Sequence, residues 1–125
     1  MIKFARCKHC GNLVDFVVDK GVPVVCCGER MEVLTANVTD AATEKHVPVA
    51  TLQGDKLHVE VGSVLHPMTK EHLIQTIVVV NGKKAQRVDL DETMSPIADF
   101  IVDASQGVEV YEYCNLHGLW KTIVK

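Results

Sequence analysis

Four of the five cysteines in this chain lie within its first 27 residues, as two close pairs. Two residues separate Cys7 from Cys10, and Cys26 directly precedes Cys27. Four thiolates at such spacing can hold one tetrahedral ion of zinc or iron. A unit of about 36 residues buries too little apolar surface to fold alone, so a bound metal has to contribute to folding. Residues 1–36 are therefore predicted to form a small metal-binding domain.

The spacing leaves a structural zinc site and a one-iron redox centre both open. The adjacent Cys26 and Cys27 favour iron, because common zinc ribbons use two Cys-x2-Cys pairs. Adjacent side chains of an extended strand point to opposite faces, so both sulfurs reach one ion only where the backbone bends. His9, between Cys7 and Cys10, is predicted to be exposed and not a ligand.

Glycines and alternating residues predict a hairpin-like unit around the cysteine pairs. Gly11 and Gly28 each follow a pair and permit turns whose backbone N–H groups point at the sulfurs. Residues 13–18 are predicted as a strand and residues 24–25 as its return partner, with a turn at residues 21–23. The two cysteine pairs are expected at the closed end of this unit.

Residues 37–125 are predicted to form an antiparallel β-sandwich. Residues 40–46 predict one helical turn with Asp40 or Thr39 as N-cap, which Pro48 ends. Short segments rich in β-branched residues follow, and Asn81-Gly82 indicates a hairpin. Six or seven strands with turns between them favour a sandwich; the predicted strands are residues 56–61, 73–80, 85–90, 98–102, 108–113 and 119–124.

Charge and hydropathy exclude several classes of function. The formal net charge is −3 and there is no basic stripe, so nucleic acid is not expected as a partner. No apolar run reaches the roughly 18–20 residues that span a bilayer. An odd number of cysteines without a secretory leader favours metal binding over disulfides. We therefore expect a cytoplasmic protein without a membrane segment.

Four histidines and an isolated cysteine form a second candidate metal site. His58 alternates with apolar residues in a predicted strand and is expected to face solvent. The other four histidines after residue 40 lie at element ends or in loops. Taken singly each is more commonly a packed or surface residue, but together with the lone cysteine they favour a site; its candidate ligands are His46, His66, His72, Cys114 and His117. Five ligands are unusual for zinc, whereas imidazole with thiolate suits iron.

The motifs around these residues resemble desulfoferrodoxin, the two-iron superoxide reductase family. The resemblance covers essentially the whole chain and lies in Cys-Lys-His-Cys-Gly-Asn, Val-Cys-Cys-Gly, Asp-Ala-Ala-Thr-Glu-Lys-His-Val-Pro-Val, Val-Gly-Ser-Val-Leu-His-Pro-Met, Lys-Glu-His and Glu-Tyr-Cys-Asn-Leu-His-Gly-Leu-Trp-Lys. The sequence departs from the expected pattern at residues 73–76, where a more aromatic and acidic stretch is typical.

The resemblance implies a desulforedoxin-like domain and an immunoglobulin-like sandwich, each with one iron. The first iron would be held by Cys7, Cys10, Cys26 and Cys27, and the second by the four histidines with Cys114 as axial ligand. It further implies a homodimer, an electron donor such as rubredoxin, and the one-electron reduction of superoxide to hydrogen peroxide without release of dioxygen.

Two charged residues beside His46 are candidate catalytic residues in this interpretation. Iron(II) with four neutral imidazoles and one thiolate carries a net charge of +1 and attracts an anion. Lys45 would add positive charge and a hydrogen-bond donor, and Glu44 would close the open iron position after oxidation. The alternatives are an electron carrier that uses only the four-cysteine iron, a structural zinc module and a superoxide dismutase.

Overall fold

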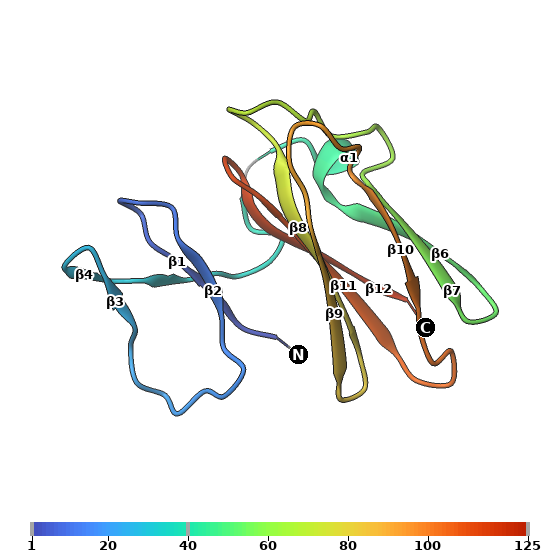
Figure 1. Cartoon of the computed structure of the whole chain (residues 1–125), viewed down its shortest axis with the longest axis horizontal. Helices are drawn as coiled ribbons and strands as arrows, with labels where there is room; N and C mark the ends of the chain where they lie inside the picture. Colours follow the sequence, from blue (N-terminus) through green and yellow to red (C-terminus); the bar gives the residue numbers. More distant parts are fainter. Residues whose placement is uncertain (1, 40, 125) are drawn as a thin grey trace. The chain divides into compact units, whose positions relative to one another are not determined.

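A computed structural model describes residues 2–39 and 41–124 of the chain (Figure 1). The chain divides into two compact units, Met1–Thr35 and Ala36–Lys125. Each unit has its own sheets and its own core. Strands make up nearly all of the regular structure, as the sequence predicts for a mainly β protein.

The first unit consists of two small antiparallel sheets. One has the order β2-β1-β5 and the other pairs β3 with β4. The Cys-x2-Cys segment closes the β1–β2 hairpin, and the Cys-Cys segment closes the β3–β4 hairpin. The strand bounds are β1 Phe4–Arg6, β2 Leu13–Asp15, β3 Val25–Cys26, β4 Glu29–Arg30 and β5 Glu32–Val33.

The pairing of these strands differs from the single hairpin that the sequence predicts. The strand expected over residues 13–18 ends at Asp15 and pairs with β1, not with residues 24–25. Residues 24–25 lie before the second cysteine pair, and Val25 pairs with Arg30 instead. Each cysteine pair lies in its own tight turn, so each joins only the segments that directly flank it.

The first unit has a very small core. Ala5, Cys7 and Met31 are buried there, with Val14 and Phe16 packed against them. Several valines remain on the surface of this unit, and Val17 is 92% exposed. So small a core agrees with a unit that needs bound metal to fold.

The second unit is an antiparallel β-sandwich of seven strands. One sheet has the order β10-β7-β6 and the other β12-β11-β8-β9, the immunoglobulin-like arrangement predicted from the sequence. The strand bounds are β6 Pro48–Gln53, β7 Lys56–Val61, β8 Ile74–Asn81, β9 Lys84–Asp89, β10 Ile97–Ile101, β11 Val108–Cys114 and β12 Gly118–Val124. The hairpin predicted at Asn81-Gly82 is confirmed, because Asn81 pairs with Lys84 and Gly82 has a φ of 63°.

Alternation along the strands forms the core of the sandwich. On β7, Leu57, Val59 and Val61 face inward and are fully buried. On β11, Val108 and Val110 face the same interior, and Cys114 continues their line at the end of the strand. The thiol of Cys114 is therefore fixed by the most buried part of the fold.

The only helix among the described residues is the short α1, Thr43–His46. Its N-cap is Ala42, without a side-chain hydrogen bond, so the prediction of Thr39 as the cap is wrong. Asp40, the other predicted cap, lies outside the described residues. The helix ends at His46 because the extended Val47 precedes Pro48, the start of β6.

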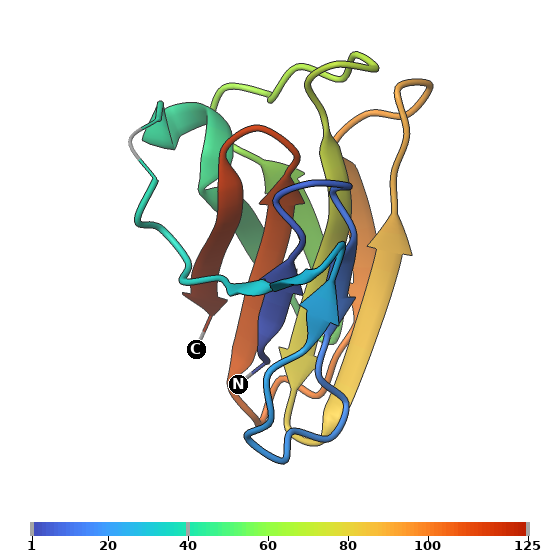
Figure 2. The same ribbon diagram turned by 90° about the vertical axis from the view of Figure 1, so that its left-hand side faces the viewer.

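Three connections meet at one end of the sandwich. α1, the β7–β8 loop and the β11–β12 turn lie there in both views (Figures 1 and 2). The β8–β9 turn and the β10–β11 loop lie at the opposite end. Within residues 2–39 and 41–124, no helix has the length and apolar character required to cross a bilayer.

Candidate metal centres

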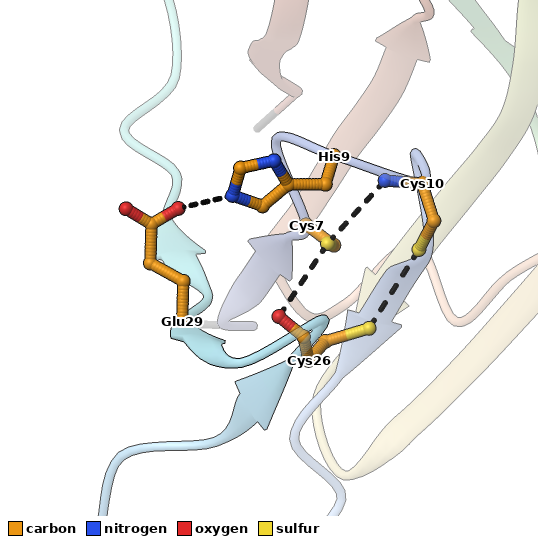
Figure 3. Close-up of polar contacts among 5 residues, drawn as sticks. All are labelled: Cys7, His9, Cys10, Cys26 and Glu29. Carbon is orange, nitrogen blue, oxygen red and sulfur yellow. Dashed lines mark hydrogen bonds and ion pairs between the residues drawn. The ribbon is translucent and has the colours of Figure 1, made fainter.

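The two cysteine pairs of the first unit form one cluster. The sulfur atoms of Cys7, Cys10, Cys26 and Cys27 all lie within 4.8 Å of one another. The Sγ atoms of Cys10 and Cys26 are 3.6 Å apart (Figure 3). Cys7 is buried, whereas Cys10 and Cys27 are exposed. Cys26 is half-buried, so the cluster lies close to the surface of its unit.

The backbone bends where the adjacent cysteines require it. Cys27 has a φ of 53° and Gly28 a φ of 75°, both in the left-handed region. The bend turns the side chains of Cys26 and Cys27 to one cluster, although adjacent residues of a strand diverge. Gly11, with a φ of 83°, performs the corresponding turn after Cys10.

Hydrogen-bond donors surround the sulfurs of this cluster. The backbone N–H of Cys10 donates to Cys7 Sγ (3.5 Å) and that of Asn12 to Cys10 Sγ (3.4 Å). The Asn12 Nδ2 donates to Cys26 Sγ (3.6 Å). The backbone bond from Cys10 is the main cause that lowers the pKa of Cys7 to about 6. These donors thus favour the thiolate form of Cys7, whereas contacts with the neighbouring cysteines raise the pKa of Cys26 and bring that of Cys27 to about 12.

The second cluster joins five residues from four segments. His46 ends α1, and His66 and His72 come from the β7–β8 loop. Cys114 ends β11, and His117 lies in the β11–β12 turn. The ligand atoms of His46, His72, Cys114 and His117 lie within 4.8 Å of one another. His66 joins them through His46, with 3.2 Å between their Nε2 atoms.

The four imidazoles form a closed ring of neighbours. In the order His46, His66, His72 and His117, adjacent ring centroids are 4.7, 4.6, 5.0 and 4.8 Å apart. Adjacent planes are nearly perpendicular, at 79° to 86°. His46 and His72 lie across the ring, 6.3 Å apart and inclined by only 29°. The longer diagonal is what a square arrangement of four side chains requires.

Backbone carbonyls orient two of the rings. The Nδ1 of His46 lies 2.7 Å from the carbonyl oxygen of Ala42, and the Nδ1 of His66 lies 2.7 Å from that of Pro67. A proton on each Nδ1 leaves the Nε2 lone pair directed at the cluster. His117 presents its Nδ1, which lies 3.0 Å from His46 Nε2 and 3.9 Å from Cys114 Sγ.

Burial favours the neutral form of three of the cluster's imidazoles. Desolvation is the main cause that lowers the pKa of His46 and His72 and brings the pKa of His66 to about 4. Desolvation likewise raises the pKa of the Cys114 thiol. A cation that binds here therefore meets three rings that favour the neutral form, and it has to displace the proton of Cys114 to bind the thiolate.

The second cluster fits a metal ion on the evidence of His72. The Nε2 of His72 is buried and has no hydrogen-bond partner among the described residues. An unpaired buried nitrogen is costly, and a metal ion among these rings would satisfy it. Four imidazoles with one thiolate suit iron more than zinc, which is overwhelmingly four-coordinate. The four thiolates of the first cluster suit either metal.

Glu44 and Lys45, the predicted catalytic residues, are exposed on α1 directly before His46. Desolvation is the largest cause of the lowered pKa of His46 and His72. The ammonium group of Lys45 is a smaller cause and acts on both rings. The helix α1 packs closely against Gly62. A Cβ at this position would collide with the backbone of Glu44 and Lys45, so the close approach requires glycine. The backbone N–H of Val64 also donates to the carbonyl oxygen of Glu44 (2.9 Å).

Two histidines lie outside both clusters. His9 is exposed and its Nε2 lies 2.6 Å from an oxygen of Glu29, away from the sulfurs (Figure 3). His58 is half-buried on β7, where its ring contacts Asp99 (2.6 Å) and Glu60 (3.2 Å). The indole of Trp120 stacks on His46, a contribution that was not predicted and that only the place of Trp120 in the last motif could have indicated.

Comparisons with known proteins agree with this fold and these clusters. The sequence model described as Desulfoferrodoxin matches residues 38–123. A desulfoferrodoxin homologue of Methanothermobacter thermautotrophicus is 44% identical over 115 residues, which are 92% of this chain and 93% of that protein. A desulfoferrodoxin of Clostridium acetobutylicum is 45% identical over 114 residues, 91% of this chain and 90% of its own.

Solved structures show the same architecture. The crystal structure of the superoxide reductase from Treponema pallidum has a TM-score of 0.78 and 35% identity, and covers 98% of each chain. A one-iron superoxide reductase from Giardia intestinalis has a TM-score of 0.60 and 30% identity over 66% of this chain and 98% of its own. The two clusters match the two-iron pattern of desulfoferrodoxin, and this chain belongs to the desulfoferrodoxin family.

Proposed function

We propose that this protein is a superoxide reductase, which adds one electron and two protons to superoxide and releases hydrogen peroxide without dioxygen. The observation that carries the proposal is the convergence of four imidazoles and one buried thiol at one end of the sandwich. Each imidazole is nearly perpendicular to the rings on either side of it. Structures of similar fold bear the name superoxide reductase, which supports the same activity.

We infer that His46, His66, His72, His117 and Cys114 would hold the catalytic iron. Iron(II) held there would supply the single electron for superoxide, and the thiolate of Cys114 would favour the transfer. Cys7, Cys10, Cys26 and Cys27 would hold the second iron. The fully buried position of Cys114 supports its role as a ligand, because water is kept away from its sulfur.

The charged residues of α1 would guide the substrate. Lys45 is exposed beside His46. Its ammonium group would attract superoxide and would itself act as a hydrogen-bond donor near the anion. Glu44 is exposed one residue earlier, and we assign to its carboxylate the closing of the open face after oxidation. The two opposite charges would thus serve opposite steps, entry of the anion and protection of the oxidised site.

Several further properties follow from this proposal. Each turnover consumes one electron, so the protein needs a donor, for which a small one-electron iron protein such as rubredoxin is suited. The exposed valines of the first unit, Val17, Val18, Val22 and Val25, support a homodimer that covers them. Reduced thiolate ligands support a cytoplasmic location, where the reaction would detoxify superoxide.

The products of the reaction test this proposal. Reduced protein is mixed with superoxide, and hydrogen peroxide and dioxygen are both measured. We expect one peroxide for each superoxide consumed and no dioxygen. Evolution of dioxygen would instead identify a dismutase, and an unchanged superoxide lifetime would leave an electron carrier. Iron content and the visible spectrum, with and without an oxidant, show in the same preparation whether both centres are loaded.

A further inference from the structure

Asn115 connects the turn that carries two members of the histidine–cysteine cluster to the segment that carries a third. It follows Cys114 directly and lies two residues before His117. Its backbone N–H donates to the carbonyl oxygen of Leu73 (3.2 Å), and its Oδ1 accepts the N–H of Leu73 (3.0 Å). Its Nδ2 donates to the carbonyl oxygen of Glu71 (2.9 Å). One residue therefore holds the backbone on both sides of His72.

The backbone of His72 itself is held from the other direction. Its N–H donates to the carbonyl oxygen (3.2 Å) and the Oγ1 (3.1 Å) of Thr69, and its own carbonyl oxygen accepts the Thr69 N–H (3.0 Å). These bonds close a local turn over residues 69–72. They do not link that turn to the sandwich, and among the described residues the hydrogen bonds that join residues 71–73 to the turn that carries Cys114 and His117 all involve Asn115.

The β-sheet does not provide this link. The ladder between β8 and β11 runs in regular register as far as Tyr113. A register shift between Tyr113 and Cys114 then pairs Cys114 with Ile74, the first residue of β8. His72 lies before the strand, beyond the last ladder pair. The side chain of Asn115 supplies hydrogen bonds where the sheet ends.

The ring of His72 depends on its backbone more than the other rings do. His46 and His66 each have an Nδ1 fixed by a backbone carbonyl oxygen. The described part of the chain offers no hydrogen-bond partner to the buried Nε2 of His72. A displacement of the backbone at residues 71–73 would therefore also displace the imidazole of His72.

We propose that Asn115 is a positioning residue of the histidine–cysteine centre, whose side-chain amide locks His72 to the turn that carries Cys114 and His117. This deepens the proposed function, on which it rests only for the identity of the metal. Residues outside the ligand set that orient ligands typically contribute about 10- to 100-fold to metal affinity. Asn115 acts on three ligands through its place in the chain and its three hydrogen bonds.

The rate of iron loss tests this role without a measurement of activity. Full-length protein with iron(II) in both centres is mixed with a chromogenic ferrous chelator, and the visible bands of each centre are followed. We expect Asn115→Ala to lose iron from the histidine–cysteine centre roughly 10- to 100-fold faster than the parent. The four-cysteine centre of the same molecule is the internal control and should release iron at the parental rate.

Asn81 offers a matched control. Its Oδ1 accepts the N–H of Asp103 (2.7 Å), and its Nδ2 donates to the carbonyl oxygens of Asp103 (3.1 Å) and Gly107 (3.3 Å). The amide thus ties two backbone segments together, as that of Asn115 does, but at the opposite end of the eight-residue β8. Asn81→Ala should lower the melting temperature and leave iron loss from both centres unchanged.

The same two variants can overturn the proposal. If folded Asn115→Ala releases iron no faster than the parent, or if Asn81→Ala accelerates the loss equally, Asn115 has only a general structural role. Should Asn115→Ala not fold, Asn115→Asp replaces it, because it keeps the acceptor for Leu73 and loses the donor to Glu71. Superoxide assays on the parent are separate, so absence of that activity would contradict the proposed function alone.

Discussion

The indole ring of Trp120 stacks on the imidazole ring of His46, with 4.9 Å between the centroids and 29° between the planes. The same indole donates from Nε1 to the carbonyl oxygen of His117 (3.2 Å). Trp120 is almost fully buried on β12. The side chain of Trp120 therefore contacts both His46 of α1 and the turn that carries His117, and it lines the proposed catalytic site.

This stack predicts that Trp120 reports the loading of the site. It is the only tryptophan of the chain, so its emission is the whole tryptophan signal. Iron bound by His46 would quench the excited indole, and removal of iron with a chelator should raise the emission. Zinc(II), which has a filled d shell and no redox chemistry, should restore little of the quenching. Emission that stays constant while iron leaves the histidine–cysteine centre would contradict its assignment to this position.

Removal of the charge at Lys45 should slow the encounter with superoxide. Lys45→Ala is expected to lower the second-order rate constant by about 10-fold and to weaken its dependence on ionic strength. Pulse radiolysis measures both quantities. Lys45→Arg keeps the charge and should retain most of the rate and its salt dependence. An unchanged rate in Lys45→Ala would remove this residue from the mechanism.

The neighbouring Glu44 should affect a later state. Glu44→Ala is expected to leave the first reaction with superoxide nearly unchanged, because the carboxylate is not required while the iron is reduced. It should alter the visible spectrum of the oxidised protein and the dependence of that spectrum on pH. If both stay as in the parent, Glu44 does not close the oxidised site.

Much of this molecule could be predicted from the sequence because its signals are local. Alternating and β-branched residues marked six of the seven described strands of the sandwich but not β6, which follows directly after the helix, and Asn81-Gly82 marked a hairpin. The spacing of cysteines and loop histidines indicated two groups of metal-binding side chains. The small hairpins of the first unit were not predicted correctly, since strands of two or three residues have no periodicity to detect.

Other features depend on contacts between distant segments. The stack of Trp120 on His46 and the bonds from Asn115 to residues 71 and 73 join parts of the chain that no spacing rule connects. The ring nitrogen that faces the cluster also depends on local backbone geometry, because His117 presents Nδ1 whereas His46 and His66 present Nε2. These contacts and ring orientations are set by the folded arrangement of the chain and not by the spacing of residues in the sequence.

Gly62 provides a test of how α1 is held. A methyl group at this position would overlap the carbonyl oxygen of Glu44 and approach the Cα of Lys45 to 2.8 Å. Gly62→Ala should therefore displace α1, lower the melting temperature and loosen the end of the helix that carries His46. Gly54→Ala is the control, because its Cβ would meet no atom within 4 Å, although its φ of 63° adds backbone strain. Faster iron loss in Gly62→Ala alone would support the prediction, and equal behaviour of the two would contradict it.

The carboxyl group of Glu112 is buried in the sandwich without a hydrogen-bond partner among the described residues. It lies on β11 opposite Trp120 and Ile77, and it continues the inward line of Val108 and Val110. Desolvation raises the pKa of Glu112 well above its ordinary value. Burial therefore favours the protonated, neutral form of this carboxyl group, which lies two residues before Cys114.

The raised pKa of Glu112 predicts a loss of stability as pH rises. Below the ordinary glutamate pKa of about 4.3, both folded and unfolded chains carry the proton. Above it the unfolded chain loses the proton while the folded chain keeps it, so the folded state becomes less favourable until pH reaches the raised pKa. The limiting slope is about 1.4 kcal/mol for each pH unit. Glu112→Gln cannot ionise and should gain stability over the parent throughout this window.

Urea unfolding of the metal-loaded parent and Glu112→Gln proteins between about pH 4 and about pH 8 measures this difference. The two proteins share the same metal ligands, so the pH dependence of metal binding cancels in the comparison. Glu109→Gln, on the same strand, is a control of opposite sign. Burial alone would raise the pKa of Glu109, but the 2.8 Å ion pair with Lys121 makes the net shift downward. That substitution should therefore cost stability at neutral pH and little at low pH. If the advantage of Glu112→Gln does not grow with pH, the carboxyl group is ionised in the folded protein and its isolation inside the sandwich is wrong.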